Sequence, residues 1–470
     1  MPASAPEWAK AIAQPGQEFG PVELQASSGT LPTDLQGSLY RNGPGRLERG
    51  GQRVNHWFDG DGAILAVHFG EGKVRSLYRY VQTLGYQQES KADRFLWGGY
   101  GMTPPGSLWT RWGKPPKNAA NTSVLALEDR LLPLWEAGRP HRLDLDTLQT
   151  LGLDDLAPPT PYSAHPKRDP VTGEIYNFGI SFGRSATLNL YRSNARGKLL
   201  QQRQILLPGS PFVHDFVLAG PYLIFCIPPL TLQLWPVLLQ IQSYSDALQW
   251  QPDQPTRLLV VDRQTLQPFS WGEADPWFQW HFCNGFLDQE SKIVLDLIQY
   301  PDFRSNQFLS EVPTGDIDTA APGTFKRLLI DPQTAALKAC TTLVAESCEF
   351  PTMQPQFTGS LHPQTYLNLH SSPQQVGREL FTTVGVYDHR QETLTKADLG
   401  DGCYPSEMIF APHPSQPEQG WLLSVVFEAQ KNLSRVWIWD THHFHEGPVC
   451  VLDLPVPIPF SFHGTWHPSR

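Results

Sequence analysis

Short runs of alternating apolar and polar residues, broken by turn residues, recur along most of the chain. The clearest series is TSVLALEDRLLPLWEAGRPHRLDLDTLQTLG, at 122–152, in which ED and EAG mark the turns. Alternation with a period of two is typical of half-buried β-strands joined by hairpins. Similar strand–turn–strand units return every few tens of residues, and no helical pattern longer than a few turns stands out. The pattern predicts an all-β protein and favours a β-propeller over two separate domains.

The chain has 470 residues, which is long for one hydrophobic core. A propeller avoids this limit because each blade packs only on its neighbours. We therefore expect a single propeller domain over residues 1–470, with inserted cap loops. Glu7–Gln14 is predicted to form a short amphipathic helix, and the Gly- and Pro-rich segment Gly98–Lys117 a long loop in a cap over one face.

The segment from Leu31 to Phe69 combines strand and turn signals. Alternation over Gly37–Arg41 predicts a strand, and the Asn, Gly and Pro residues that follow predict a loop. In FDGDG, at 58–62, the paired Asp-Gly steps are typical of a hairpin turn into the next strand. A calcium loop is the alternative, but the spacing of the acidic residues is not that of an EF-hand.

The most unusual stretch of the chain is apolar and follows FVHD, at 212–215. No charged residue occurs over the 30 positions from Phe216 to Ser245, and four prolines, at 221, 228, 229 and 236, would break a membrane-spanning helix. We expect a buried strand over Phe216–Ile227, then an apolar loop or short helix over Pro228–Ile241. Part of that second segment would dock on a membrane surface, the alternative being a buried core or dimer contact. The residues of this predicted patch are Leu230, Leu232, Leu234 and Trp235.

Composition narrows the range of functions. The formal net charge of −10 argues against a nucleic-acid partner, which would need a basic face. The six cysteines show no CxxC spacing, so no zinc or iron–sulfur motif is indicated. The first residues lack the basic and apolar regions of a signal peptide. We therefore expect a cytoplasmic protein with reduced thiols.

Four of the fifteen histidines stand in short, unusual contexts: His165 in SAHP, His214 in FVHD, His281 in WHFCN and His463 in FHGTW. Any one of them alone would be explained as a hydrogen-bonded core residue. Inner strands of different blades meet at a propeller axis, however, where four such imidazoles could share a metal ion. Imidazole suits iron, zinc and copper. The cluster THHFHEG, at 441–447, is interpreted as an exposed turn rather than a metal site.

A histidine that binds a metal usually donates its other N–H to a carboxylate or a carbonyl group. Three glutamates in apolar contexts are candidates for this role: Glu136 in LWEAG, Glu349 in CEFP and Glu407 in SEMIF. A buried glutamate is costly unless it is paired. A carboxylate that faces solvent at a strand end would also explain each of the three.

Ten short motifs follow one another between about Gly20 and Trp466. They are GSLYRNGPG (37–45), FDGDG (58–62), NTSV (121–124), LWEAGRPHRLD (134–144), SAHP (163–166), FVHD (212–215), WHFCN (280–284), CEFP (348–351), EMIFAPHP (407–414) and FHGTW (462–466). Together they resemble the carotenoid cleavage oxygenases, and most of all the cyanobacterial-type apocarotenoid oxygenases.

The resemblance implies a seven-bladed β-propeller with a cap of loops and short helices over one face. It implies one Fe(2+) per chain, with the ligands and catalytic residues His165, His214, His281 and His463. Glu136, Glu349 and Glu407 would hold His214, His281 and His463, respectively. Thr122, Trp135, Phe212 and Tyr300 fall at positions that line the substrate tunnel in relatives. Two departures, Phe282 in place of a second histidine and the apolar segment Pro228–Ile241, leave substrate choice less defined than iron chemistry.

The function implied by the resemblance is oxidative cleavage of a carotenoid or apocarotenoid double bond by O2. Two carbonyl products would form, retinal among them, and the partners would be an apolar polyene and a membrane surface. The alternatives are an iron-dependent polyene isomerase or isomerohydrolase and a non-catalytic carotenoid-binding propeller. An isomerase would not need O2, so oxygen dependence distinguishes it from a cleavage enzyme. A carotenoid-binding propeller would show no turnover.

Overall fold

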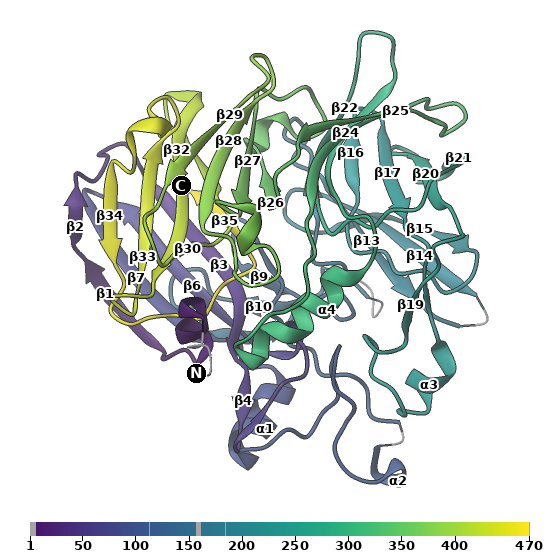
Figure 1. The fold of residues 1–470 in the computed structure, drawn as a ribbon, viewed down its shortest axis with the longest axis horizontal. Helices are drawn as coiled ribbons and strands as arrows, with labels where there is room; N and C mark the ends of the chain where they lie inside the picture. The colour runs from purple at the N-terminus through teal and green to yellow at the C-terminus, as the bar shows by residue number, and fades with distance from the viewer. Residues whose placement is uncertain (1–5, 112, 157–160, 184, 470) are drawn as a thin grey trace.

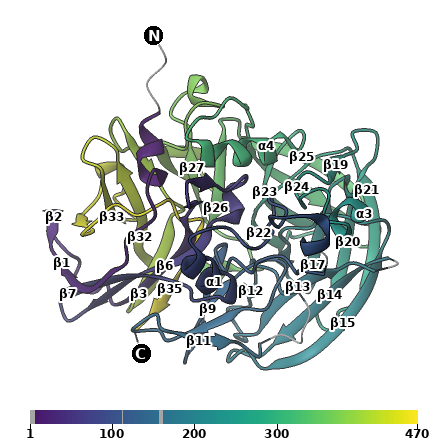
Figure 2. The same cartoon turned by 90° about the horizontal axis from the view of Figure 1, so that it is seen from below.

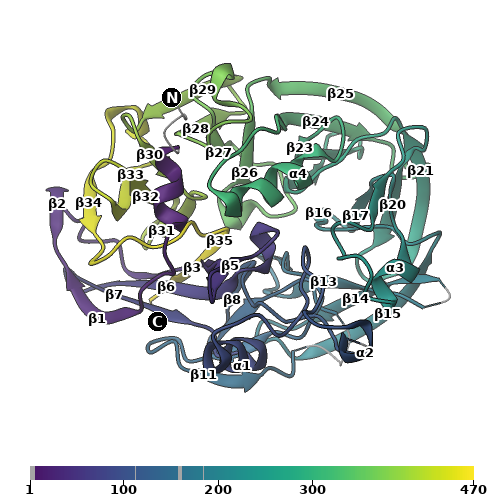
Figure 3. The ribbon, with the colours of Figure 1, turned by 60° about the horizontal axis from the view of Figure 1, so that its bottom comes forward.

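Seven antiparallel sheets form a ring in the computed structural model, which describes residues 6–111, 113–156, 161–183 and 185–469. Figure 3 shows the ring with the long strands β15 and β25 at its rim. The sheets are the blades of a propeller, so the all-β, seven-bladed fold predicted from the sequence is confirmed.

The blades follow the order of the chain. Blade 1 contains β1 (Phe19–Leu24), β7 (Lys73–Tyr80), β6 (Asp61–Gly70), β3 (Gly37–Arg46) and β35 (His463–Pro468); blade 2 contains β11 (Thr150–Leu153), β10 (His141–Leu143), β9 (Leu131–Leu134) and β8 (Ser123–Ala126); blade 3 contains β12 (Lys167–Arg168), β13 (Ile175–Ser181), β14 (Ala186–Ser193) and β15 (Leu199–Leu207). Blade 4 contains β16 (Val217–Ala219), β17 (Tyr222–Ile227), β20 (Thr256–Asp262) and β21 (Pro268–Ala274); blade 5 contains β22 (Phe282–Leu287), β23 (Ile293–Gln299), β24 (Thr324–Ile330) and β25 (Leu337–Val344). Blade 6 contains β26 (Cys348–Thr352), β27 (Gln364–Leu369), β28 (Thr383–Asp388) and β29 (Thr393–Asp398); blade 7 contains β30 (Cys403–Pro405), β31 (Ile409–His413), β32 (Gln416–Glu428), β33 (Leu433–Asp440), β34 (Cys450–Asp453) and β2 (Ala26–Gly29).

Segments from both ends of the sequence close the ring. The strand β35, late in the chain, pairs with β3 in blade 1, and β2, early in the chain, pairs with β34 in blade 7. The first of these pairings sets Asn42 opposite His463 and so brings His463 to the inner edge of blade 1. Closure at two places leaves no free blade edge at the junction.

The middle strands are apolar on both faces because each blade packs between two others. In β17 all residues but Tyr222 are buried, and in β23 all but Gln299. Phe178 of blade 3 meets Phe216 and Phe225 of blade 4, with both ring-centroid distances at 5.5 Å. Burial of such a side chain contributes roughly 1.5–3 kcal/mol, so contacts of this kind stabilise the ring blade by blade.

Short helices and two small ribbons gather over one face of the ring, at the bottom of Figure 1 and towards the viewer in Figure 2. They are α1 (Leu84–Ala92), α2 (Leu108–Arg111), α3 (Leu234–Leu238), α4 (Arg304–Glu311), β4 (Glu48–Arg49) with β5 (Gln52–Arg53), and β18 (Leu230–Leu232) with β19 (Leu248–Trp250). Short 3₁₀ helices occur at Glu7–Ile12, where a short helix was predicted, and at Trp57–Asp59, Val312–Thr314, Pro355–Phe357, Pro373–Gln375 and Phe444–Glu446. Among the described residues, no helix is long and apolar enough to cross a membrane.

The prediction of a loop after Arg41 is wrong, because β3 continues to Arg46. Its Gly and Pro residues lie in the ladder with β6, where backbone groups approach closely. A Cβ atom at Gly43 would lie 2.5 Å from Cα of Ser461, so glycine is required there for packing rather than for a turn.

The FDGDG segment is neither a tight hairpin turn nor a calcium loop. Asp59 is buried and accepts the backbone N–H of Gly101, while Asp61 begins β6 and pairs with Arg49 at 2.6 Å and Lys117 at 3.1 Å. Both carboxylates are used to hold cap segments against blade 1. Their basic and backbone partners lie far away in the sequence, which is why the local pattern suggested a simple turn.

The apolar segment after Asp215 is divided more finely than predicted. Gly220 and Pro221 turn the expected single strand into the hairpin of β16 and β17. Leu230 and Leu232 of β18 are buried in the core, so they cannot belong to a membrane-facing patch. Leu234 is partly buried, and Trp235 is 74% exposed.

Candidate metal centre

Four histidines meet where the innermost strands of four blades begin. His165 lies just before β12, His214 before β16 and His281 before β22, while His463 is the first residue of β35. The Nε2 atom of His214 lies 3.0 Å from Nε2 of His165 and 3.4 Å from Nε2 of His281. The His463 ring centroid lies 4.7 Å from that of His281 and 4.9 Å from that of His165. The propeller thus brings together residues almost 300 positions apart, as predicted for the four histidines.

Three glutamates contact the opposite nitrogen of three of these rings. Oε1 of Glu136 contacts Nδ1 of His214. Nδ1 of His281 donates to Oε2 of Glu349 at 2.7 Å, and Nδ1 of His463 donates to Oε1 of Glu407 at 2.9 Å. Because a carboxylate only accepts, it places the ring proton on Nδ1 and leaves the lone pair of Nε2 directed towards the other imidazoles.

The glutamates are themselves anchored. Glu349 accepts a hydrogen bond from the Tyr300 hydroxyl at 3.1 Å. Glu407 accepts the backbone N–H of Gly464 at 2.9 Å and lies 3.6 Å from the fully buried guanidinium of Arg41. Burial would raise the pKa of Glu407, but His463 and Arg41 outweigh it and hold that pKa below its usual value. The carboxylate is therefore ionised and able to orient its histidine.

On balance, burial and the neighbouring imidazoles disfavour charge on His165 and His463, but not on His281. Burial, with the neighbouring imidazoles, lowers the pKa of His165 well below its usual value. Burial also lowers the pKa of His463, in spite of Glu407. In His281 burial acts in the same direction, but the Glu349 carboxylate outweighs it and raises the pKa. Neutral imidazoles with converging Nε2 lone pairs are the donor set that a divalent transition metal requires, so these residues fit a metal ion.

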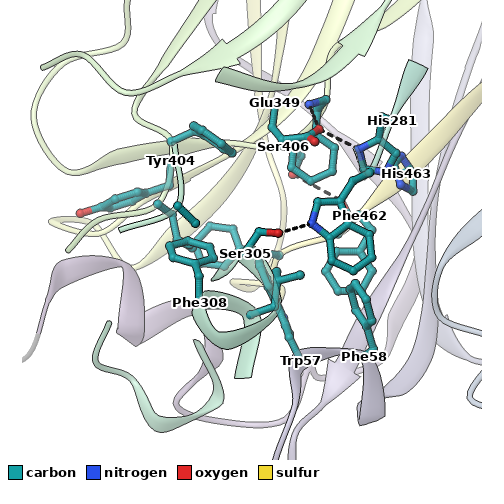
Figure 4. A pocket seen from close by; sticks show the side chains of 18 of the residues that line it. Trp57, Phe58, His281, Ser305, Phe308, Glu349, Tyr404, Ser406, Phe462 and His463 are labelled. Carbon is teal, nitrogen blue, oxygen red and sulfur yellow. Dashed lines mark hydrogen bonds and ion pairs between the residues drawn. The ribbon is translucent and has the colours of Figure 1, made fainter. Parts of the chain in front are cut away.

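An apolar cavity opens on one side of the histidines. Its wall includes His214, His281 and His463, together with the large apolar side chains Trp57, Phe58, Trp280, Phe308, Leu309, Phe350, Leu380, Phe381, Phe460 and Phe462. Figure 4 shows Phe462 near His463 on this wall, with Trp57 and Phe58 further from the histidines. Among the described lining residues, Glu349 is the one carboxylate, and none is Lys or Arg. The cavity is thus suited to an apolar, uncharged ligand.

Comparison with known proteins agrees with this geometry. The model of the family described as retinal pigment epithelial membrane protein matches residues 12–468. The chain belongs to that family. It is 33% identical to the apocarotenoid-15,15'-oxygenase of Synechocystis, over 98% of this chain and 96% of the relative, and 26% identical to the isoeugenol monooxygenase of Pseudomonas nitroreducens, over 94% and 93%. A structure of the cobalt-substituted Synechocystis oxygenase superposes with a TM-score of 0.89 at 32% identity, covering 98% of each chain.

Of the four residues predicted to line a substrate tunnel, two line the apolar cavity and two do not. Thr122 and Tyr300 line the apolar cavity. Phe212 does not, because it packs into an aromatic cluster, with ring-centroid distances of 5.9 Å to Trp280 and 6.3 Å to Phe278. Trp135 also lies outside the described lining, in the partly exposed turn after β9. For Phe212 and Trp135 the role in the substrate tunnel stays a prediction.

Sequence reasoning missed most of the aromatic wall. Trp280 and Phe462 each stand one residue before a predicted ligand, and Trp57 and Phe58 belong to the FDGDG region. Trp280 and Phe462 could have been predicted to line the cavity, because each is the neighbour of a histidine that lies at the propeller axis. Phe308 and Leu309, on α4, carried no such signal.

A second group, Asp296, His362 and His389, lies between blades 5 and 6. Here Arg327 donates to Nδ1 of His389 at 2.9 Å, and the Asn284 amide donates to Nδ1 of His362 at 3.2 Å. Because both partners are N–H donors, each Nδ1 atom must accept a hydrogen bond. Each neutral ring therefore carries its own proton on Nε2. Burial lowers the pKa of His362 to about 4 and that of His389 to about 3, which keeps both rings neutral.

The Thr365 hydroxyl receives those two N–H groups, at 3.1 Å from Nε2 of His362 and 2.8 Å from Nε2 of His389. Neither Nε2 atom then offers a lone pair to a metal ion. The group is a hydrogen-bond network that joins two blades, in contrast to the four converging histidines. In the third cluster, His442, His443 and His445 are exposed, in line with the predicted turn.

Proposed function

We propose that this protein is a non-haem iron(II) dioxygenase that cleaves a polyene double bond of an apocarotenoid or carotenoid, with retinal among the products. One observation carries the proposal: three of the four converging histidines also form part of the wall of an apolar cavity. A double bond held in that cavity would lie beside the metal. The Synechocystis oxygenase aligns with 98% of this chain, which supports oxidative cleavage over the other chemistries considered.

The residues available for metal binding are His165, His214, His281 and His463, with one iron per chain. Four neutral imidazoles suit ferrous iron, and when bound it would supply the activation of dioxygen. Glu136, Glu349 and Glu407 keep the proton on the far nitrogen of their histidines. They also supply negative charge near the metal without occupying its coordination positions.

The reaction balances without a further reductant. The carbon–carbon double bond breaks, and each of its two carbons takes one oxygen atom of O2 to become a carbonyl group. The part of the protein is to fix which double bond lies at the centre. Phe58, Trp280 and Phe462 restrict the position of a flat polyene and exclude water from the cavity.

An extended hydrocarbon fits this cavity better than a phenol does. The Ser305 hydroxyl already accepts from Nε1 of Trp280 at 2.9 Å, and the Tyr404 hydroxyl donates to Glu379 at 2.9 Å. Both nitrogens of His370 are hydrogen-bonded as well. A phenolic hydroxyl would find few unbonded polar groups on this mostly apolar wall, so part of its desolvation would go uncompensated. We therefore favour a polyene over the phenylpropene named in the isoeugenol relative.

The test is incubation of iron(II)-loaded protein with an all-trans apocarotenal in mild detergent, aerobically and anaerobically, with isoeugenol in parallel. We expect two oxygen-dependent carbonyl products from the apocarotenal, whose lengths identify the bond cut, and none from His281→Ala. Turnover of isoeugenol alone would overturn the substrate assignment. Oxygen-independent isomerisation would identify the polyene isomerase, and binding without turnover the carotenoid-binding alternative.

We also propose that the cap docks on a membrane surface, through a corrected set of residues. Trp235, Leu238, Leu239 and Ile241 are exposed on and after α3, and Trp109 on α2 is 93% exposed. The two segments are joined, since Gln240 donates to the backbone oxygen of Lys114 at 2.9 Å. They lie on the cap face in Figure 3. Polyene substrates dissolve in membranes, so docking there would let them enter without crossing water.

The docking proposal is tested by flotation with vesicles of phosphatidylcholine and phosphatidylglycerol. Trp235→Glu should weaken binding by at least about 10-fold, because insertion of one large apolar side chain contributes roughly 1.5–3 kcal/mol. The matched control is Trp271→Glu, which changes a 40% exposed tryptophan on the outer strand β21. Equal loss of binding in both variants would contradict a specific patch.

A further inference from the structure

His165 differs from the other three histidines of the centre in its supporting contacts. In the described part of the chain, no carboxylate oxygen lies within 4.0 Å of its ring nitrogens, whereas His214, His281 and His463 each have a glutamate. A ligand whose orientation is free loses rotamer entropy on metal binding. The structure must therefore hold His165 through its backbone or leave it loose.

A partly buried ion pair adds to that backbone support, beside the Ser163 hydroxyl that accepts the N–H of His165 at 3.2 Å. Lys167, two residues after His165, extends its Nζ to within 2.8 Å of Oδ1 of Asp215, the residue directly after His214. Lys167 also lies over the ring of Phe216, at 5.9 Å from the centroid. The side chain of Asp215 is 1% exposed, so its charge requires a partner. The pair ties the His165 segment of blade 3 to the His214 segment of blade 4.

The same carboxylate reaches a third ligand segment. Oδ2 of Asp215 accepts the backbone N–H of Phe282 at 3.0 Å, and Phe282 directly follows His281 in blade 5. Oδ1 also accepts the backbone N–H of Phe216 at 2.8 Å. One buried carboxylate therefore fixes the chain one or two residues beyond three of the four histidines.

We propose that Asp215 and Lys167 are positioning residues for the metal centre, which hold His165, His214 and His281 at the spacing that a metal ion requires. They also complete the charge of the centre. Four carboxylates and two basic side chains surround it, so a divalent cation brings the total to zero: Glu136, Glu349, Glu407 and Asp215, with Arg41 and Lys167. This inference rests on the proposed metal centre but not on the identity of the substrate.

The experiment measures the binding of Co(II) and Fe(II) to the full-length chain, by chelator competition and by the visible spectrum of the Co(II) form. Lys167→Met should weaken metal binding by about 10- to 100-fold and alter the Co(II) bands, because removal of a group that supports a ligand typically has that effect. Asp215→Asn should do the same or more. Lys167→Arg, which keeps the charge, should restore most of the affinity and the native Co(II) bands.

The matched control is the ion pair of Arg263 and Asp169, which also bridges blades 3 and 4, at 2.7 Å, but lies further along the chain, four residues after His165. Arg263→Met should leave both metal affinity and the Co(II) spectrum unchanged. If Lys167→Met lowers only thermal stability, with metal affinity and spectrum equal to those of Arg263→Met, the positioning role is overturned. Failure of the wild-type chain to bind either metal would instead overturn the proposed metal centre. Should Asp215→Asn not fold, Lys167→Met and Lys167→Arg still decide the question, since both leave Asp215 its two backbone donors.

Discussion

The Tyr300 hydroxyl donates a hydrogen bond to Oε1 of Glu349 at 3.1 Å, while the other oxygen of that carboxylate accepts from His281 at 2.7 Å. Tyr300 is buried and also lines the apolar cavity. The two residues therefore connect the substrate wall to the metal centre. A change at Tyr300 should be felt both by the ligand in the cavity and by His281.

Tyr300→Phe tests this connection. It removes one hydrogen bond to a buried carboxylate, a type that contributes about 1.5–3 kcal/mol, and leaves the ring in place. We expect metal affinity to fall about 10-fold, at the lower end of the effects seen for groups that support a ligand. Chelator competition measures this. Tyr404→Phe is the control, because Tyr404 lines the same cavity but bonds to Glu379; equal affinity in the two variants would contradict the prediction.

Glu349→Gln should weaken metal binding more strongly, by about 100-fold. The amide of glutamine can donate to Nδ1 of His281, which favours the tautomer with its proton on Nε2, the atom that faces the other imidazoles. Metal stoichiometry after dialysis against a chelator measures the effect. Glu346→Gln is a nearby control, since Glu346 is exposed and pairs with Lys396. Full metal retention by Glu349→Gln would show that the carboxylate does not set the tautomer.

The sequence was enough to single out the four histidines and three glutamates, through their short contexts and the family resemblance, although each residue alone also had a structural explanation. The sequence was insufficient for side chains whose hydrogen-bond or ion-pair partners lie elsewhere in the chain. Asp59 and Asp61 looked like turn residues, since nothing nearby shows that Gly101, Arg49 and Lys117 reach them. Burial of these two aspartates follows from the fold of the cap, not from the local pattern.

The apolar segment after Asp215 shows a second limit of prediction from the sequence. Leu230 and Leu232 alternate, which is the strand period, whereas Trp235, Leu238 and Leu239 recur at helical spacing. That change of period separates the buried residues of β18 from the exposed residues of α3. Treating the stretch as one patch mixed the two. The change of period marks where one element ends and the next begins, but which of the two elements faces solvent depends on the blades beneath.

Arg41→Met should destabilise the fold by about 3–5 kcal/mol, the usual effect of leaving a buried charge unpaired. Arg41 is fully buried, donates to the backbone oxygen of Glu407 at 2.6 Å and to that of Phe462 at 3.1 Å, and lies near the Glu407 carboxylate. Urea denaturation measures the change. Arg304→Met, which removes an exposed ion pair with Asp302, should cost less than about 1 kcal/mol. Similar losses in both variants would contradict the buried role of Arg41.

Asp59 gives a prediction for the pH dependence of stability. Its buried carboxyl accepts the Gly101 N–H through both oxygens, and burial, only partly offset by that bond, raises its pKa from 3.8 to about 6. Between those two values the unfolded chain releases the proton while the folded chain keeps it. A raised carboxyl pKa therefore favours the fold at low pH, and this contribution is lost as the pH rises to about 6.

The loss amounts to about 3 kcal/mol, at 1.36 kcal/mol for each pKa unit. Asp59→Asn removes the titration, so its free energy of unfolding relative to the wild type should increase by roughly that amount between about pH 4 and pH 7. Urea denaturation across this range measures the difference. Asp93→Asn, at a position whose side chain is 71% exposed, should show no such trend. A difference between Asp59→Asn and the wild type that does not vary with pH would mean that Asp59 is already ionised in the folded protein well below pH 6.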